Sequence, residues 1–340
     1  MMRTRGIAEM TRASICIAMA IVGSLMSGPP AGASIKLEGV PPFSHVFVIM
    51  GENTELGQIN KQDAPYLLNT IKPQSAWLTG YFALTHFSEA NYVGMMSGQF
   101  TSCQQFDGSA ASCHQDVDNF FHQLDGAGVS WQSWMESMPE PCYLTSTGGR
   151  KTLNHYGAKH NPAIFFDDIE GEGGVWSETN KSAECLANDI PAGSTGPNDM
   201  SAFEAALDSG AVGRFDYVVP NECEDAHDNC GPQGNSISQF DDFLAREIPA
   251  IQAYASAYDP RTVIVITFDE GTSSRGLGHG HQFAGGGNVV FAVLGSLVQP
   301  GKYGGTFDHY SFLRTMEDGF GIQTYLGGAG TASPINTIWR

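Results

Sequence analysis

Basic residues are scarce in this chain of 340 residues, where 17 Lys and Arg stand against 36 Asp and Glu and give a net charge of −19 at pH 7. A surface this acidic repels nucleic acid and anionic membranes, so neither is expected as a partner. It also repels any anionic small molecule unless bound cations reverse the potential locally. Solubility outside the cell is a second reason for such a charge, and both can hold together.

Several well-known catalytic motifs are absent. The chain has no GxSxG elbow, no P-loop, no HExxH, no CxxC pair, and no GxGxxG after a strand. These absences weaken the usual serine hydrolase reading and exclude P-loop, zincin and dinucleotide-binding signatures. The sequence also lacks an internal repeat, a low-complexity tract or a long linker, which favours one domain.

No apolar run reaches the ~20 residues of a membrane-spanning helix. The run at 15–26 follows Arg3, Arg5 and Arg12 and precedes the triplet 31–33, Ala-Gly-Ala. This order predicts a secretory signal peptide over residues 1–33, with an uncleaved anchor as the competing interpretation. The remaining domain, 34–340, is then expected to be secreted or periplasmic, without stable insertion in a membrane.

Of seven cysteines, Cys16 lies in the predicted signal peptide, and an even set of six in an exported chain indicates disulfides. Two pairs are close enough in sequence to close small loops, and the third pair is what remains. The expected bonds are Cys103–Cys113, Cys223–Cys230 and Cys142–Cys185, although spacing alone leaves other connectivities open.

Short apolar, β-branched runs separated by helical stretches predict a three-layer α/β/α domain with a largely parallel central sheet. The predicted strands are 45–50, 215–219, 261–268 and 288–294, and the predicted helices are 64–71, 91–96, 117–126, 236–257 and 310–320. The segment 167–197 is rich in Gly, Ser, Glu and Asn, so we expect it to form a surface excursion over the core.

Polar residues follow two of these strands. Glu52 and Asn53 come after the first, and Asp269 and Glu270 come after the third. Carboxyl ends of parallel strands meet at one edge of a sheet, where ligands bind. Each pair alone fits a helix cap or a solvated turn, but together they offer several oxygen ligands to a divalent cation.

Ser88 is expected at the N-cap of the helix containing Asn91. An ordinary capping serine explains this position, yet free N–H groups and the helix dipole also attract an anion there. A third polar cluster, Asn221, Asp225 and His227, follows the second strand. A disulfide-pinned acidic turn and a set of ligands or phosphate contacts explain it equally well. Among the remaining histidines, His279 and His281 are the more suggestive, because they lie in a Gly-rich loop soon after Asp269.

Six blocks of sequence resemble a bacterial and fungal phosphoesterase family that includes acid phosphatases and phosphatidylcholine-type phospholipases C, within the alkaline phosphatase-like superfamily. They occur in the family's order, span most of the chain after residue 33, and read HVFVIMGEN (45–53), THFSEANYVGMMSG (85–98), KHNP (159–162), PNECEDAHD (220–228), VIVITFDEG (263–271) and HYSFLRTMED (309–318). The chain departs from the family where Phe87 and Ala90 replace common prolines and where ENTELG replaces ENRSFD. These departures leave the pocket entrance and the preferred leaving group open.

The resemblance implies a role for each matching residue. Ser88 is the implied nucleophile and Asn91 the implied phosphate contact. The implied metal ligands are Glu52, Asn53, Asp269 and Glu270, and the implied pocket residues are His160, Asn221, Asp225, His227 and His309. Beyond what the resemblance implies, we expect Ser88 to bind the metal, His309 or His281 to protonate the leaving oxygen, and His86 and His279 to lie in the pocket.

The sequence therefore predicts a secreted, metal-dependent phosphoesterase, similar to acid phosphatases, that hydrolyses small phosphate monoesters through a phosphoserine. A phospholipase C-type phosphodiesterase is the alternative with the same site, disfavoured by the short acidic chain. A non-catalytic, secreted metal-binding or adhesion protein is the alternative from another class. The identity and number of the metal ions (Ca, Zn, Mg or Mn) and the oligomeric state stay open.

Overall fold

An eight-stranded sheet runs through residues 35–340, with the strand order β5-β4-β6-β1-β7-β8-β2-β9. The structure is a computed structural model that describes residues 36–340, apart from 101–102, 104–105 and 277–284. The strands of the sheet are β1 (Val46–Gly51), β2 (Ala76–Leu78), β4 (Trp131–Met135), β5 (Asp189–Pro191), β6 (Phe215–Val219), β7 (Val263–Phe268), β8 (Phe291–Gly295) and β9 (Gly301–Tyr303).

The sheet is largely parallel. Strand β1 pairs in parallel with both β6 and β7, so that Val46 lies opposite Phe215 and Val263. Strand β8 runs antiparallel to both of its neighbours. Every residue of β1, β6 and β7 is buried, as expected for strands covered on both faces. A separate two-stranded sheet joins β3 (Tyr81–Phe82) to β10 (Phe307–Asp308).

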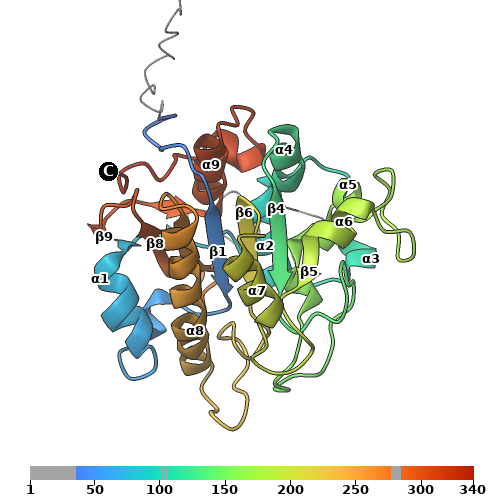
Figure 1. Cartoon of the computed structure of the whole chain (residues 1–340), viewed down its shortest axis with the longest axis horizontal. Coiled ribbons are helices and arrows are strands. Elements are labelled where there is room, and N and C mark those ends of the chain that lie inside the picture. Colours follow the sequence, from blue (N-terminus) through green and yellow to red (C-terminus); the bar gives the residue numbers. More distant parts are fainter. Residues whose placement is uncertain (1–35, 101–102, 104–105, 277–284) are drawn as a thin grey trace, which may run out of the picture. The chain divides into compact units, whose positions relative to one another are not determined.

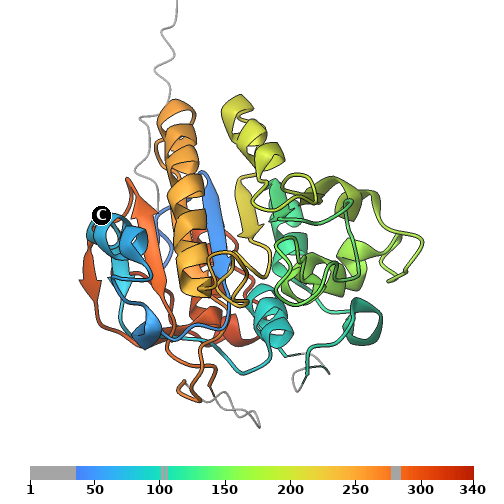
Figure 2. The ribbon, with the colours of Figure 1, turned by 90° about the horizontal axis from the view of Figure 1, so that it is seen from below.

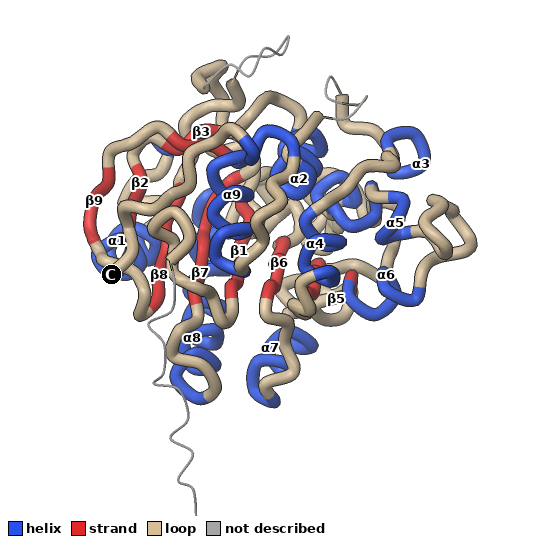
Figure 3. Tube along the Cα trace, turned by 90° about the horizontal axis from the view of Figure 1, so that it is seen from above, coloured by secondary structure: helices blue, strands red, loops and turns tan. Residues whose placement is uncertain are grey.

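Helices cover both faces of the sheet, one face being seen in Figure 2 and the other in Figure 3. Helices α7 (Ser201–Ser209) and α8 (Ser236–Ala257) pack together on one face, in the foreground of Figures 1 and 2. Helices α2 (Ser88–Ser97), α4 (Phe120–Gly126) and α9 (His309–Phe320) pack together on the other. The predicted three-layer fold is confirmed. The shorter helices are η1 (Leu56–Gln58), η2 (Leu67–Ile71), α1 (Lys72–Gln74), α3 (Ala110–Cys113), η3 (Ala158–His160), η4 (Pro162–Phe165), α5 (Asp167–Glu170), α6 (Ala183–Asn188) and η5 (Gly327–Gly330).

The segment 167–197 differs from the surface excursion that its composition suggested. It contains α5, α6 and β5, and β5 adds an edge strand to the central sheet by pairing with β4. Cys185 and Asp189 are fully buried, and a disulfide ties Cys185 to Cys142. A strand of three residues, one of them proline, has too little periodicity to stand out in a polar sequence.

The structure contains the three disulfides that spacing favoured, Cys103–Cys113, Cys142–Cys185 and Cys223–Cys230. Within the described part of the chain, none of the helices has the length and apolar character needed to cross a membrane. The predicted signal peptide, 1–33, lies outside the described residues and stays a prediction.

Candidate active site

Three buried carboxylates meet at the carboxyl edge of the sheet. Glu52 directly follows β1, and Asp269 and Glu270 follow the adjacent strand β7, so parallel pairing brings them together. One oxygen from each lies within 4.8 Å of the others, and the three residues are at most 4% exposed. Asn53 joins them through its backbone N–H, which donates to Asp269 Oδ1 at 3.1 Å.

Ser88 points into this cluster from the first turn of α2. Its Oγ donates to Glu52 Oε1 and lies 3.4 Å from Glu270 Oε1. The N-cap of α2 is Phe87, one residue earlier than expected, and Ser88 is the first helical residue. The helix is therefore longer than the predicted 91–96. Its C-cap, Gly98, lies in the left-handed region and ends it.

Strained backbone surrounds the cluster. Asn53, Phe87 and Ala226 have φ values of +50°, +78° and +83°, which residues other than glycine rarely adopt. Each is next to, or within one residue of, a side chain predicted to function. Such conformations cost ~1–3 kcal/mol each and persist where the surrounding structure fixes them, as is common at functional sites.

Three cationic groups surround Glu52. His160 Nε2 lies 3.3 Å and Lys159 Nζ 3.7 Å from Glu52 Oε1, while His227 Nε2 lies 3.6 Å from Oε2. Burial by itself would raise the pKa of Glu52, but His160, Lys159 and His227 together lower it well below its ordinary value. Glu52 is therefore an anion at any working pH.

The buried carboxylates in turn keep the two histidines beside them protonated. Burial favours neutral His160, yet hydrogen bonding to Asp225 and Glu52 raises the pKa of His160 well above its ordinary value. Contact with Glu222 raises the pKa of His227 to about 9. The pKa of Asp269 is raised, first by burial and then by the neighbouring negative charges of Glu52 and Glu270. This crowding of carboxylates favours a bound proton or a cation.

His86 borders the cluster on its other side. Its Nδ1 lies 2.5 Å from Glu270 Oε2 and its Nε2 lies 3.1 Å from the carbonyl of Ser273. Hydrogen bonding to Glu270 raises the pKa of His86. The ring is partly exposed, so it connects the carboxylates with solvent.

Asn91 has a different task from the predicted phosphate contact. Its Oδ1 accepts from the backbone N–H groups of Leu84 and Thr85, and its Nδ2 donates to the carbonyls of Thr85 and Phe87. These four bonds use the full capacity of the amide, and the residue is fully buried. Asn91 thus holds the loop that presents Ser88.

His309 also differs from its predicted role as proton donor. The ring is fully buried, with Nδ1 2.8 Å from Tyr81 Oη and Nε2 2.6 Å from the backbone carbonyl of Asp269. Burial lowers the pKa of His309 to about 4. A neutral ring with both nitrogens engaged supports the strand end at Asp269.

The third predicted cluster divides into two parts. Asn221 is a turn residue, because its Oδ1 accepts from the N–H groups of Cys223 and Glu224 and its Nδ2 contacts Ser137 Oγ. Asp225 lies 3.4 Å from His160 Nδ1, and burial raises its pKa to about 6. The predicted pocket residue His279 and the predicted proton donor His281 lie outside the described residues.

Sequence reasoning passed over Lys159 and Asp107. Lys159 Nζ lies 3.3 Å from Asp107 Oδ2, and Asp107 Oδ1 accepts from the backbone N–H of Glu89, at the start of α2. The KHNP block was noted for its histidine, and its lysine was the available signal. Asp107 lies outside every block, so nothing in the sequence pointed to it.

Solved structures with this architecture include a member of the alkaline phosphatase superfamily. A Vibrio parahaemolyticus protein described as a member of the alkaline phosphatase superfamily aligns with a TM-score of 0.51 at 13% identity, over 87% of this chain and 71% of that chain. The lipoteichoic acid synthase LtaP of Listeria monocytogenes aligns with a TM-score of 0.50 at 13% identity, over 85% and 77%. At such identities the likeness establishes the fold alone.

The chain belongs to the Phosphoesterase family, whose model matches residues 44–323. A phosphatidylinositol-3-phosphatase of Mycobacterium tuberculosis is 26% identical over 349 residues, covering 98% of this chain and 99% of that protein. A probable acid phosphatase of Kluyveromyces lactis is 27% identical over 282 residues, covering 81% of this chain but only 58% of that protein. The predicted family and enzyme class, a phosphoric ester hydrolase, are confirmed.

Proposed function

We propose that this protein hydrolyses phosphate monoesters with Ser88 as the nucleophile, at a site that requires a divalent cation. The observation that supports this most directly is the contact of Ser88 Oγ with Glu52 Oε1, inside a cluster of three buried carboxylates. A serine placed only to cap a helix has no need of buried anions around its hydroxyl.

The donor set fits a divalent cation. Glu52 Oε2 and Asp269 Oδ2 are buried and have no hydrogen-bond partner among the described residues. Buried, unpaired carboxylate oxygens are costly unless a cation or a proton compensates them. Glu52, Asp269, Glu270 and Ser88 would hold the ion, and the ion would lower the pKa of the serine hydroxyl and offset charge on phosphate oxygens.

The chain's own residues supply the rest of the chemistry. Lys159 and His227 attract the phosphate dianion, although the chain as a whole is acidic. Ser88 Oγ passes its proton to the carboxylate of Glu270, whose Oε1 lies 3.4 Å away, and forms a bond to phosphorus in line while the bond from phosphorus to the leaving oxygen breaks. The leaving oxygen takes its proton from His281. Water then gives a proton to His281 and attacks phosphorus, the bond from phosphorus to Ser88 Oγ breaks, and Glu270 returns its proton to the serine as phosphate leaves.

A phospholipase C-type phosphodiesterase remains the second function compatible with this site. Measuring phosphate release from p-nitrophenyl phosphate, and cleavage of p-nitrophenyl phosphocholine, separates the two. Phosphatidylinositol 3-phosphate belongs in the same panel, because one relative is named for it. We expect the monoester to be the better substrate. Preference for the diester by kcat/KM would assign the chain to the phospholipase class.

Ser88→Ala tests the nucleophile, and Ser97→Ala is its control. Ser97 lies on the same helix, is also buried, and donates to the carbonyl of Val93, so both variants lose one buried hydroxyl. We expect turnover to fall about a thousandfold or more in Ser88→Ala alone. Unchanged turnover in Ser88→Ala would remove the assignment of Ser88 as the nucleophile, whereas a wild type without any turnover would favour the non-catalytic, metal-binding alternative.

We also propose that the protein acts outside the cytoplasm. Three disulfides within the described residues support this, because such bonds persist in oxidising compartments. The predicted signal peptide over residues 1–33 points the same way. N-terminal sequencing of protein from the periplasm or the medium tests it, with a start at residue 34 expected and an intact N-terminus against it.

A further inference from the structure

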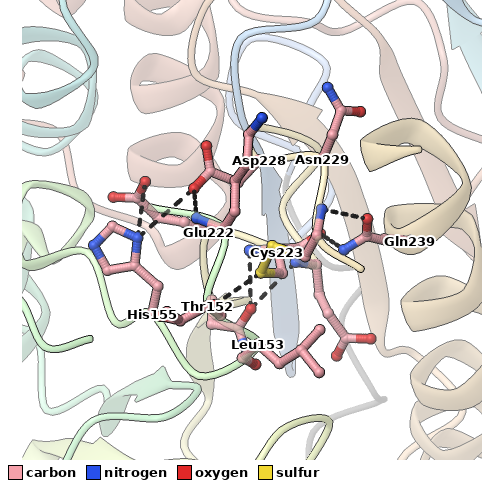
Figure 4. The surroundings of a disulfide bond; sticks show 12 residues. Thr152, Leu153, His155, Glu222, Cys223, Asp228, Asn229 and Gln239 are labelled. Atoms are coloured by element: carbon pink, nitrogen blue, oxygen red, sulfur yellow. Dashed lines mark hydrogen bonds and ion pairs between the residues drawn. A yellow bond between two sulfur atoms is a disulfide. The ribbon is translucent and has the colours of Figure 1, made fainter. Parts of the chain in front are cut away.

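A second cluster of possible ligands lies behind His227, on the side away from Glu52. His155, Glu222 and Asp228 each offer a ligand atom within 4.8 Å of the others. Figure 4 shows the ring of His155 directed at the carboxylates of Glu222 and Asp228, beside the disulfide of Cys223. The ring of His227 faces the same two carboxylates through Nδ1.

The separations between these atoms fit one small cation. His155 Nδ1 lies 3.5 Å from Glu222 Oε2 and 3.9 Å from Asp228 Oδ2. His227 Nδ1 lies 3.3 Å from Glu222 Oε2 and 3.2 Å from Asp228 Oδ1. Zinc bonds of about 2.0–2.2 Å in a tetrahedron place ligand atoms about 3.4 Å apart, which is close to these four separations between the two imidazoles and the two carboxylates.

The two imidazole nitrogens are not accounted for by hydrogen bonds. Both Nδ1 atoms are shielded from solvent and have no partner in hydrogen-bonding geometry among the described residues. Each lies at a similar distance from both carboxylates, whereas one N–H donates to one acceptor. The side chains of Glu222 and Asp228 are 94% and 99% buried. Two adjacent negative charges at this depth need nearby positive charge to compensate them.

Backbone contacts hold the donors in place. The N–H of Glu222 donates to the carbonyl of His155 at 3.0 Å, and the N–H of Asp228 donates to the carbonyl of Glu222 at 2.8 Å. The N–H of Lys151 donates to Asp228 Oδ2 at 2.6 Å, which orients that carboxylate from outside. Such outer contacts are typical of metal sites.

We propose that His155, Glu222, His227 and Asp228 form a second, four-coordinate zinc site. Two imidazoles with two carboxylates suit a borderline cation, because calcium and magnesium take six or more oxygen ligands. The four protein donors fill a tetrahedron, so the site stabilises the turn and does not bind substrate. It also positions His227, whose Nε2 then carries the ring proton and faces Glu52.

Cobalt substitution tests the proposal without relying on activity. The metal-depleted protein is titrated with Co²⁺, and its visible absorption is recorded. Four-coordinate cobalt absorbs strongly in this range, whereas six-coordinate cobalt absorbs weakly. Wild type and Glu52→Gln should both give the strong band, since Glu52 lies outside the four donors. His155→Gln should lose it and should bind about one zinc fewer by elemental analysis. His114→Gln, an exposed histidine paired with Asp167, is the control.

Asp228→Asn provides a second variant that preserves size and the acceptor for the N–H of Lys151. Zinc should raise the melting temperature of wild type and His114→Gln by several degrees, and that of Asp228→Asn much less. Equal zinc content and equal cobalt spectra in wild type, His155→Gln and Asp228→Asn would overturn the proposal. The cluster would then be a set of ion pairs between histidines and carboxylates.

Discussion

The ammonium of Lys159 lies 3.3 Å from the carboxylate of Asp107, and the other oxygen of that carboxylate accepts from the N–H of Glu89 at the start of α2. A cation and a helix N-terminus are the two features that bind phosphate oxygens. We therefore expect Asp107 to compete with a phosphate group for both partners.

Asp107→Asn should strengthen binding of inorganic phosphate. Removing one negative charge about 4 Å from a bound anion is worth ~1 kcal/mol in a water-like surrounding, or about fivefold in the inhibition constant. Competitive inhibition by phosphate measures it. Asp116→Asn, which removes a charge from an exposed position in the same part of the chain, should change nothing. Weaker inhibition in Asp107→Asn would mean that Asp107 assists phosphate binding.

Lys159→Met should lower kcat/KM for p-nitrophenyl phosphate about tenfold to a hundredfold, because a hydrogen bond to a charged group contributes ~1.5–3 kcal/mol. Methionine keeps the length of the stem, so the packing changes little. Lys61→Met, at an exposed position, is the control. An unchanged kcat/KM, with the fold intact by circular dichroism, would exclude Lys159 from the site.

Phe87 tests whether backbone strain presents the nucleophile. Phe87→Gly and Phe87→Ala both remove the ring, but only glycine tolerates φ of +78° and ψ of +118° without strain. We expect Phe87→Gly to be more stable than Phe87→Ala by ~1 kcal/mol. This is the reverse of the usual order, in which alanine is the more stabilising residue beside a helix. Urea unfolding of the two variants measures the difference. A more stable Phe87→Ala would show that the backbone at position 87 changes its conformation and is not held under strain.

Stability should fall between about pH 4 and about pH 7. Burial raises the pKa of Asp189 to about 7, from an unfolded value near 4. In this window the folded state binds one proton more than the unfolded state. The contribution of Asp189 to stability is therefore full below pH ~4 and is lost as the pH rises through 7. Burial also raises the pKa of Glu247, to about 7, with the same sign.

Asp189→Asn isolates one such group, because it keeps the size of the side chain and removes the charge. Urea unfolding at pH 4.5 and 7.5 should show a smaller loss of stability in the variant than in wild type. An equal loss in both would mean that Asp189 stays ionised through the window.

The sequence was sufficient to predict the parallel core and the meeting of Glu52 with Asp269, because apolar β-branched runs and the polar residues after them report burial and strand direction. It missed β2, β4, β5 and β9, whose mixed or short sequences lack a clear period. The hydrogen bonds of Asn91 and His309 could not be predicted from the sequence for another reason. A motif specifies residue types, whereas only coordinates show that their hydrogen-bonding groups are already engaged.

The central claim is that the hydroxyl of Ser88 becomes covalently bonded to phosphorus. Rapid acid quenching during turnover of p-nitrophenyl phosphate, followed by peptide mass spectrometry, tests it most directly. The account predicts a phosphoryl group on Ser88 in wild type and in Ser97→Ala. Turnover at the normal rate with no phosphoryl group on Ser88, or with one on another residue, would contradict it.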